Sequence, residues 1–424
     1  MLIPLGPSGF TATMCADFFF TELDPRAAVK GSRDPLGMQG VWAGLGRQVI
    51  GNLTTVTQSA RGFTTLLVGV YLADRAAERA RDRAVGEAFL SWEQLAGYAR
   101  RCFHGAEGLL GQRKIEARTE LGRATLSAGP EAQILANQRA YGLWGLYTSA
   151  ARSSGFVEST GPSRLTAAGR DLVSTNHLPK LESTWGTDAR RLVDLLARDR
   201  AAVTISLHNP ELRAIAAMLS PKLELGEARI YTDHLVNGGP GDPTSGRQRR
   251  LASAMRSVGS ADAHSLAKVA DRDLVTHIDH IRAAESALAP IGALFSYLLT
   301  QDGNALDTVA HNVASTWGRG LESIWPAAGE VLPPQLKHAS EALTQGDYEE
   351  ALELLLERNK TVMAERGGSA AWATVGSAGK LDVRFREDDG ALPSGETVRT
   401  MWRNPYFLPS LWSVIGQIEH GIAR

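Results

Sequence analysis

Apolar side chains recur at helical spacing in two successive runs between Gly31 and Asp74, and the rest of the chain is interpreted around this stretch. The first run is Met38, Val41, Trp42, Leu45 and Val49, and the second is Phe63, Leu66, Leu67, Val70 and Tyr71. The pair Gly51-Asn52 lies between the runs. We expect two amphipathic helices joined by a tight turn, with apolar faces buried against each other or against the rest of the domain.

The other faces of this predicted hairpin carry hydrogen-bonding side chains and arginines, with almost no lysine or glutamate. A solvated helical face normally carries lysine and glutamate, so this composition indicates a surface that holds something polar. The candidate ligand-binding residues are Gln39, Arg47, Asn52, Thr54, Thr55, Gln58 and Arg61.

Helical patterns dominate the rest of the chain and short strands are scarce, so the sequence predicts a mainly α, multi-helical protein. One helix is expected to begin at Ser91 as its N-cap. Beyond Leu181 we expect helices over 186–199, 209–220, 245–258, 262–300, 304–318, 336–345 and 347–366. A small β-hairpin is predicted around Gly379, before a closing helix rich in aromatic residues.

The segment 131–176 has a different order of elements. A helix ending near Gly155 is followed by a short β run, a turn at 160–162, a second strand and a helix that begins within RLTAAGR. This order resembles a winged helix-turn-helix, a unit that usually binds DNA but often serves only in protein–protein contacts. The arginines predicted to contact DNA are Arg139, Arg152, Arg164 and Arg170. We therefore divide the chain into an N-terminal helical domain (1–125), a winged-helix-like unit (126–180) and a C-terminal helical domain (181–424).

Composition limits the classes of function. The 424 residues include 45 Lys and Arg against 46 Asp and Glu, so the net charge gives no general argument for nucleic-acid binding. Cys15 and Cys102 are too few for a disulfide scaffold, which suits a reducing cytoplasm. No apolar run approaches the length of a membrane span, so we expect a cytoplasmic protein with no membrane contact.

Familiar catalytic signatures are missing from the sequence. The pair His277 and His280 would share a helical face, but only His264 offers a third ligand nearby, so no metal site and no cofactor are expected. A cluster of arginines beside the glycine-rich loop 238–246 is a better candidate for phosphate contact, because few acidic residues neighbour it in sequence. These arginines are Arg247, Arg249 and Arg250.

Asp34 is the leading candidate for catalysis. Asp34-Pro35 is typical of a helix start, with Asp34 as N-cap, and the helix dipole would keep its carboxylate ionised. Cleavage of an N-glycosidic bond develops oxocarbenium character that such a carboxylate stabilises. Asn52, also assigned to catalysis, and Thr55 could then read the edge of an extruded base, and Arg61 a phosphate. Glu22 and Asp24 are reserve carboxylates.

Several blocks of the sequence resemble a bacterial defence-island family of anti-phage DNA glycosylases. They are SRDPLGMQGVW, GNLTTVTQSARGFTTLL, WEQLAGYAR, ILANQRAYGLWGLYTSAARSSG and the closing WRNPYFL. The resemblance implies excision of a modified base from double-stranded phage DNA, which leaves an abasic site that blocks replication. It also implies a hypermodified pyrimidine, such as glucosylated hydroxymethylcytosine, as the target. The resemblance identifies no catalytic residue by position. The assignment of Asp34 and Asn52 to catalysis therefore depends only on the chemistry and spacing of the residues themselves.

The leading hypothesis is therefore a DNA glycosylase that flips the target base and needs no metal or organic cofactor. The alternative is a non-catalytic, DNA-binding subunit of a larger defence or restriction assembly. A winged-helix transcriptional regulator is a third hypothesis, and it would require a dimer, for which no helix is evident. The sequence indicates neither the oligomeric state nor an abasic lyase activity.

Overall fold

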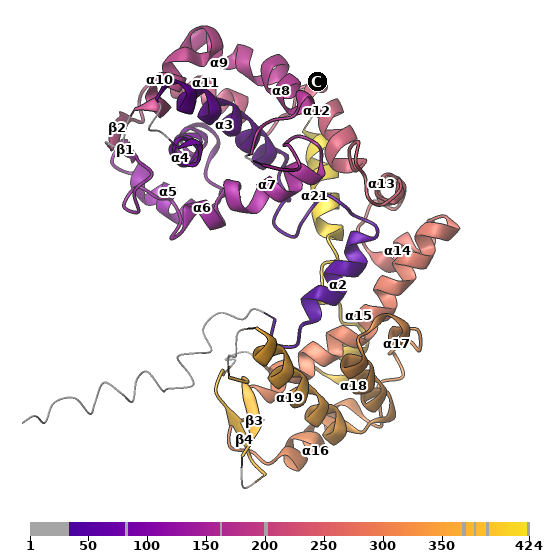
Figure 1. Ribbon diagram of the computed structural model, residues 1–424. Helices are drawn as coiled ribbons and strands as arrows, with labels where there is room; N and C mark the ends of the chain where they lie inside the picture. Colours follow the sequence, from indigo (N-terminus) through magenta and orange to yellow (C-terminus); the bar gives the residue numbers. More distant parts are fainter. Residues whose placement is uncertain are drawn as a thin grey trace, which may run out of the picture. The chain divides into compact units, whose positions relative to one another are not determined.

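The computed structural model describes residues 34–80, 84–161, 163–198, 202–366, 370–376, 379–386 and 390–421. The described chain is mainly helical, as predicted, and contains two short two-stranded sheets (Figure 1). It forms two compact units, each assembled from segments that are distant in sequence. Unit 1 comprises Met1–Ala43 and His280–Asn404, and unit 2 comprises Gly44–Asp279 and Pro405–Arg424. The units do not follow the three consecutive domains (1–125, 126–180 and 181–424) expected from the sequence.

Unit 2 is built around two helices, α3 (Ala60–Arg79) and α4 (Val85–His104). Every residue from Ala60 to Val70 and from Ala88 to Ala99 is buried. A helix that is buried on all sides belongs in a core, and α3 and α4 pack directly against each other. The indole Nε1 of Trp92 links them by donating to the carbonyl oxygen of Thr65 at 2.8 Å.

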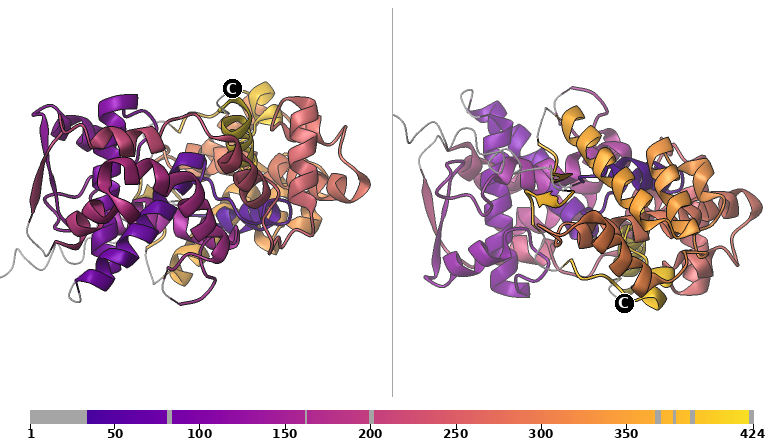
Figure 2. Two further views of the ribbon diagram at one scale, coloured as in Figure 1. Left: turned by 90° about the horizontal axis from the view of Figure 1, so that it is seen from above. Right: turned by 90° about the horizontal axis from the view of Figure 1, so that it is seen from below.

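The other helices of unit 2 are shorter (Figures 1 and 2). They are α5 (Gln112–Thr119), α6 (Gln138–Tyr141), α7 (Leu143–Ser153), α8 (Ala167–Leu172), α9 (Leu178–Trp185), α10 (Arg190–Ala197), α11 (Leu212–Met218), α12 (Leu225–Tyr231), α13 (Arg247–Val258), α14 (Ala263–Leu266) and α21 (Leu408–His420). The π-helical turns η2 (Val173–His177) and η4 (Thr232–Val236) and the 3-10 turn η3 (Thr187–Ala189) join several of them. At the edge of the unit, β1 (Arg123–Leu126) pairs antiparallel with β2 (Val203–Ser206).

Unit 1 contains the helices α16 (Leu306–Trp317), α17 (Ala328–Val331), α18 (Pro334–Gln345), α19 (Tyr348–Glu365) and α20 (Gly395–Thr400). Helices α2 (Met38–Arg47) and α15 (Arg272–Leu298) each have residues in both units. The hairpin predicted around Gly379 is confirmed: β3 (Ala373–Val375) pairs antiparallel with β4 (Leu381–Val383). Within the described residues, no helix combines the length and the apolarity that crossing a membrane would need.

The predicted tight turn between the first two helices is wrong. Residues 48–59 separate α2 from α3, and part of this segment is buried. The guanidinium of Arg47 organises the segment by donating to the carbonyl oxygens of Gly51 at 3.1 Å and Leu53 at 2.6 Å. Ser91 is also not a helix start, because α4 begins at Val85 and Ser91 lies in its interior.

The segment predicted to resemble a winged helix contains the helices α6, α7 and α8 and most of the π-helical turn η2, with one antiparallel bridge between Val157 and Leu165. The bridge is isolated, so the described residues here form no regular strand. The helical part of the prediction is therefore observed, whereas the winged-helix identity stays a prediction.

Candidate active site

The predicted helix start at Asp34-Pro35 is wrong, because α2 of unit 1 begins at Met38 and Gly37 before it has φ +67°. Asp34 nevertheless reaches the first turn of α2 with its side chain. Its carboxylate accepts hydrogen bonds from the backbone N–H groups of Met38 at 2.8 Å and Gln39 at 3.0 Å. Arg366 pairs with the same carboxylate at 3.0 Å. These contacts engage the Asp34 carboxylate at the start of α2. The predicted ligand-binding residue Gln39 is exposed. Glu22 and Asp24 lie outside the described residues.

Asn52 belongs to unit 2 and is buried. Its side-chain amide donates to the carbonyl oxygen of His234 at 2.7 Å, and its oxygen accepts from Gln248 Nε2 at 2.7 Å. Gln248 also donates to the carbonyl oxygen of Leu235 at 2.7 Å. Asn52 therefore connects its segment to η4 and α13 within unit 2, whereas Asp34 belongs to unit 1.

Arg61 is buried against a second polar group of unit 2. It pairs with Glu227 and donates to the carbonyl oxygens of Ser220 and Lys222. Thr64 also donates to Glu227, at 3.0 Å. The guanidinium is largely committed to these partners, which limits its capacity to hold a phosphate.

Three predicted ligand-binding residues, Thr55, Gln58 and Arg61, do line one cavity, with a volume of about 550 Å³. We call it the α3–α4 cavity, because its central wall is made by those two helices. Gly62 and Thr65 of α3, with Ala96 and Gly97 of α4, form this wall. The wall also includes Glu93, Arg100, Ile115, Leu143, Tyr147 and Gln417. A volume of this size is typical of small-molecule sites.

Glu93 is the titratable group that distinguishes this cavity. Its side chain is only 3% exposed, and no cationic side chain among the described residues pairs with it. Burial raises the pKa of Glu93 to about 7, and hydrogen bonds from Leu143 and Gln138 oppose the rise. A carboxyl group with a pKa near neutrality can donate and accept a proton under physiological conditions.

Two donors fix the Glu93 carboxyl group in place. Its Oε1 accepts from the backbone N–H of Leu143 at 2.6 Å, at the first turn of α7. Its Oε2 accepts from Gln138 Nε2 at 2.8 Å. Gly142, the N-cap of α7, makes this approach feasible, because a Cβ there would lie 2.6 Å from Glu93 Oε2.

Gln138 is itself held in one orientation. Its Oε1 accepts from the backbone N–H of Ile134 at 3.1 Å and from Gln94 Nε2 at 3.3 Å. Its amide nitrogen must then point the other way, toward Glu93 and the carbonyl oxygen of Leu90. Gln138 is therefore a positioning residue for the carboxyl group.

Tyr147 supplies an aromatic wall to the cavity. Its ring packs against Gly62, where an added Cβ would lie 2.5 Å from the ring, and makes an edge contact with Phe63 at 5.1 Å between centroids. Burial raises the pKa of Tyr147 to about 12, so its hydroxyl group stays protonated at neutral pH.

The predicted DNA-contacting arginines divide into two groups. Arg139, Arg164, Arg170 and Arg249 are exposed. Arg170 also donates to the carbonyl oxygen of Leu165 at 2.6 Å. Arg152 is less exposed and donates to the carbonyl oxygens of Glu158 at 3.2 Å and Gly161 at 3.3 Å, and so holds the turn between α7 and α8.

Arg247 and Arg250 meet acidic side chains that their sequence neighbourhood does not contain. Arg250 pairs with Asp271 at 2.9 Å and with Asp273, and Arg247 lies 3.8 Å from Asp273. Their predicted phosphate contact must therefore compete with intramolecular ion pairs. No group of three potential metal ligands occurs among the described residues.

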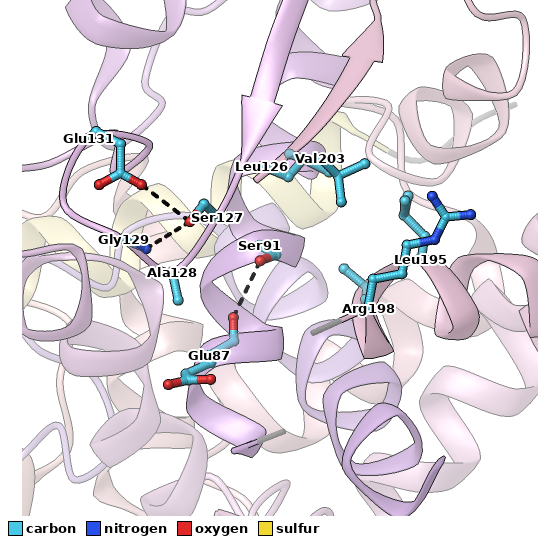
Figure 3. Close-up of a pocket in the computed structure, with 11 residues that line it drawn as sticks. Glu87, Ser91, Leu126, Ser127, Ala128, Gly129, Glu131, Leu195, Arg198 and Val203 are labelled. Carbon is cyan, nitrogen blue, oxygen red and sulfur yellow. Dashed lines mark hydrogen bonds between the residues drawn. The ribbon is translucent and has the colours of Figure 1, made fainter. Parts of the chain in front are cut away.

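A second cavity of unit 2, of about 320 Å³, lies between α4, the β1–β2 pair and α10 (Figure 3). Glu87 and Glu131 flank it, but its two hydroxyl groups are already engaged. Ser91 donates to the carbonyl oxygen of Glu87 at 3.4 Å, and Ser127 bonds to Glu131 at 3.4 Å. This cavity offers no buried acid comparable to Glu93.

Glu93, Gln138 and Tyr147 were not among the site residues predicted from the sequence. A signal for Glu93 existed, since a lone carboxylate interrupts the otherwise uncharged run FLSWEQLAGYA. All three also lie within two of the blocks that carry the family resemblance, WEQLAGYAR and ILANQRAYGLWGLYTSAARSSG. Comparison with known protein families, curated proteins and solved structures found no match to this chain.

Proposed function

We propose that the protein is an anti-phage DNA glycosylase that excises a modified base, and that Glu93 is its catalytic residue. The observation that carries the proposal is a buried carboxyl group, with a pKa of about 7, in the wall of a cavity large enough for a flipped nucleoside. In this proposal Glu93 takes the place of Asp34, whose carboxylate is engaged by Arg366.

Protonated Glu93 donates its proton to the leaving base as the bond between C1′ and the base nitrogen breaks, and the bonding electron pair goes to the base. Water then adds to the cationic C1′ carbon. The proton lost by this water returns to the Glu93 carboxylate, which regenerates the acid. The products are a free base and an abasic site, and no metal or organic cofactor takes part.

Two features support a nucleobase as the occupant. Tyr147 offers a ring on which an extruded base can stack, and Thr55 and Gln58 provide hydrogen-bonding groups for its edge. The resemblance of the surrounding blocks to defence glycosylases favours a modified pyrimidine, such as glucosylated hydroxymethylcytosine, over an unmodified base. Arg139, Arg164 and Arg170, on the proposed winged-helix-like segment, are exposed and suited to contact the flanking duplex.

The test is release of free base, measured by mass spectrometry, from phage DNA with and without modified cytosine. We expect the wild-type protein to release the modified base and Glu93→Gln to be at least about 100-fold slower. Glu353→Gln, which changes an exposed glutamate on α19, is the matched control and should retain the wild-type rate. Wild-type release by a folded Glu93→Gln variant would refute the assignment of Glu93.

The non-catalytic DNA-binding subunit is the second candidate. It is favoured by one observation, the helix–bridge–helix arrangement of α7, Val157↔Leu165 and α8 with exposed arginines beside it. It predicts a gel shift with intact DNA, and no alkali-labile site after incubation.

A further inference from the structure

The α3–α4 cavity contains a cation whose hydrogen-bonding capacity is not fully used. Arg100 lines the cavity, and its Nε is buried with no hydrogen-bond partner. Its Nη2 donates to the carbonyl oxygen of Glu107 at 2.9 Å. Among the described residues, no carboxylate lies within ion-pair distance of this guanidinium. A half-buried arginine with a spare donor is suited to an oxyanion such as phosphate, whose oxygens accept hydrogen bonds from the planar guanidinium.

A glycine-rich loop lies next to Arg100 and forms part of the same wall. Gly108, Leu109 and Leu110 line the cavity, between the end of α4 and the start of α5. Gly108 has φ +72°, and a Cβ there would meet nothing within 4 Å, so backbone conformation and not space explains the glycine. The backbone N–H of Leu109 donates to the carbonyl oxygen of Ala106 at 3.1 Å, so the N–H groups of Gly108 and Leu110 are the ones the loop can offer to an anion.

The spacing between Glu93 and Arg100 limits what the ligand can be. Both residues lie on α4 and line the cavity, and seven residues of helix correspond to a rise of about 10 Å. A free base that reaches Glu93 would not extend to Arg100. A nucleotide would reach both, with its base and sugar at Glu93 and a phosphate at Arg100.

We propose that Arg100 and the loop 108–110 form a phosphate subsite, so that the α3–α4 cavity binds a nucleotide and not a free base or nucleoside. This inference rests on the proposed glycosylase function for the orientation of the nucleotide. The phosphate subsite itself rests on Arg100 and the loop.

Calorimetric titration of the full-length protein tests the subsite with three probes: 2′-deoxycytidine 5′-monophosphate, 2′-deoxycytidine and inorganic phosphate. We expect the monophosphate to bind about tenfold tighter than the nucleoside, from charge-assisted hydrogen bonds. Arg100→Gln should remove this difference, and Arg100→Lys should retain part of it. Arg101→Gln, a change at the next position of α4 that does not line the cavity, should leave the difference intact.

The inference is overturned if the wild-type protein binds nucleoside and monophosphate equally or binds neither. It is also overturned if a folded Arg100→Gln variant keeps the tenfold preference, or if inorganic phosphate alone binds as tightly as the monophosphate. A tenfold preference that depends on Arg100, without any base release from modified DNA, would support the nucleotide site and reject the glycosylase. Base release from modified DNA, together with equal binding of the nucleoside and the monophosphate, would support the glycosylase and reject the phosphate subsite.

Discussion

The pKa of Glu93 makes a specific prediction for stability as a function of pH. Burial raises this pKa from 4.5 to about 7 on folding, so the folded protein binds the Glu93 proton more tightly than the unfolded chain does. The contribution to stability is complete below pH 4.5 and is lost as the pH rises through 7. At about 1.36 kcal/mol per pH unit of this interval, the loss amounts to about 3 kcal/mol.

Glu93→Gln removes the titrating group and leaves the others in place. His177, whose pKa burial lowers to about 3, has the opposite effect between pH 3 and 6.5, because its unfolded form binds the proton more tightly. Burial also raises the pKa of Glu227. Both groups are present in the variant, so they cancel when the wild-type and variant free energies of unfolding are subtracted at each pH.

The measurement is urea unfolding of both proteins at half-unit steps from pH 4.5 to 8. Hydrogen exchange of peptides from α4 identifies the transition of unit 2. We expect the stability of the wild type relative to Glu93→Gln to fall by about 3 kcal/mol up to pH 7 and then to level off. A difference that is constant over this range, or that grows with pH, would refute the assignment of a raised pKa to Glu93.

Two further substitutions test the surroundings of the site. Gly142→Ala introduces a Cβ 2.6 Å from Glu93 Oε2 and 2.4 Å from the carbonyl oxygen of Gln138, so we expect slower base release and a lower melting temperature. Unchanged values of both would contradict the described approach of Glu93 to α7. Arg61→Met removes the ion-pair partner of buried Glu227 and should lower the free energy of unfolding by about 3–5 kcal/mol, measured by urea unfolding. A cost below 1 kcal/mol would show that the Arg61–Glu227 pair is not buried as described.

Local periodicity predicted most helices well, because it depends only on neighbouring residues. The segments 245–258 and 304–318 were predicted as helices, and α13 (Arg247–Val258) and α16 (Leu306–Trp317) occupy them. The range 262–300 is instead divided into α14 and α15, and the side chain of Asp271 accepts from the backbone N–H of Leu274 where α15 begins. A short break of this kind leaves the apolar pattern almost unchanged, so periodicity does not detect it.

The candidate site was harder to predict, because its polar side chains are satisfied by partners far away in sequence. Asn52 bonds to Gln248, 196 positions away, and Arg61 bonds to Glu227, 166 positions away. From the sequence alone, a helical face without lysine or glutamate is equally consistent with a ligand site and with a buried network. Thr55 and Gln58 do line the α3–α4 cavity, whereas Asn52 stabilises the fold.

The contrast between Asp34 and Glu93 explains why a different carboxyl group is now preferred for acid–base chemistry. The carboxylate of Asp34 is engaged by Arg366 and by two backbone N–H groups at the start of α2. Glu93 receives two hydrogen bonds but no cationic partner among the described residues, so the cost of burying its charge dominates. Each of its oxygens uses one lone pair for a fixed donor and keeps another for a proton or a water molecule. A proton-transfer group must gain and lose its proton near neutral pH, and the raised pKa of Glu93 therefore favours it over Asp34 for the proposed reaction.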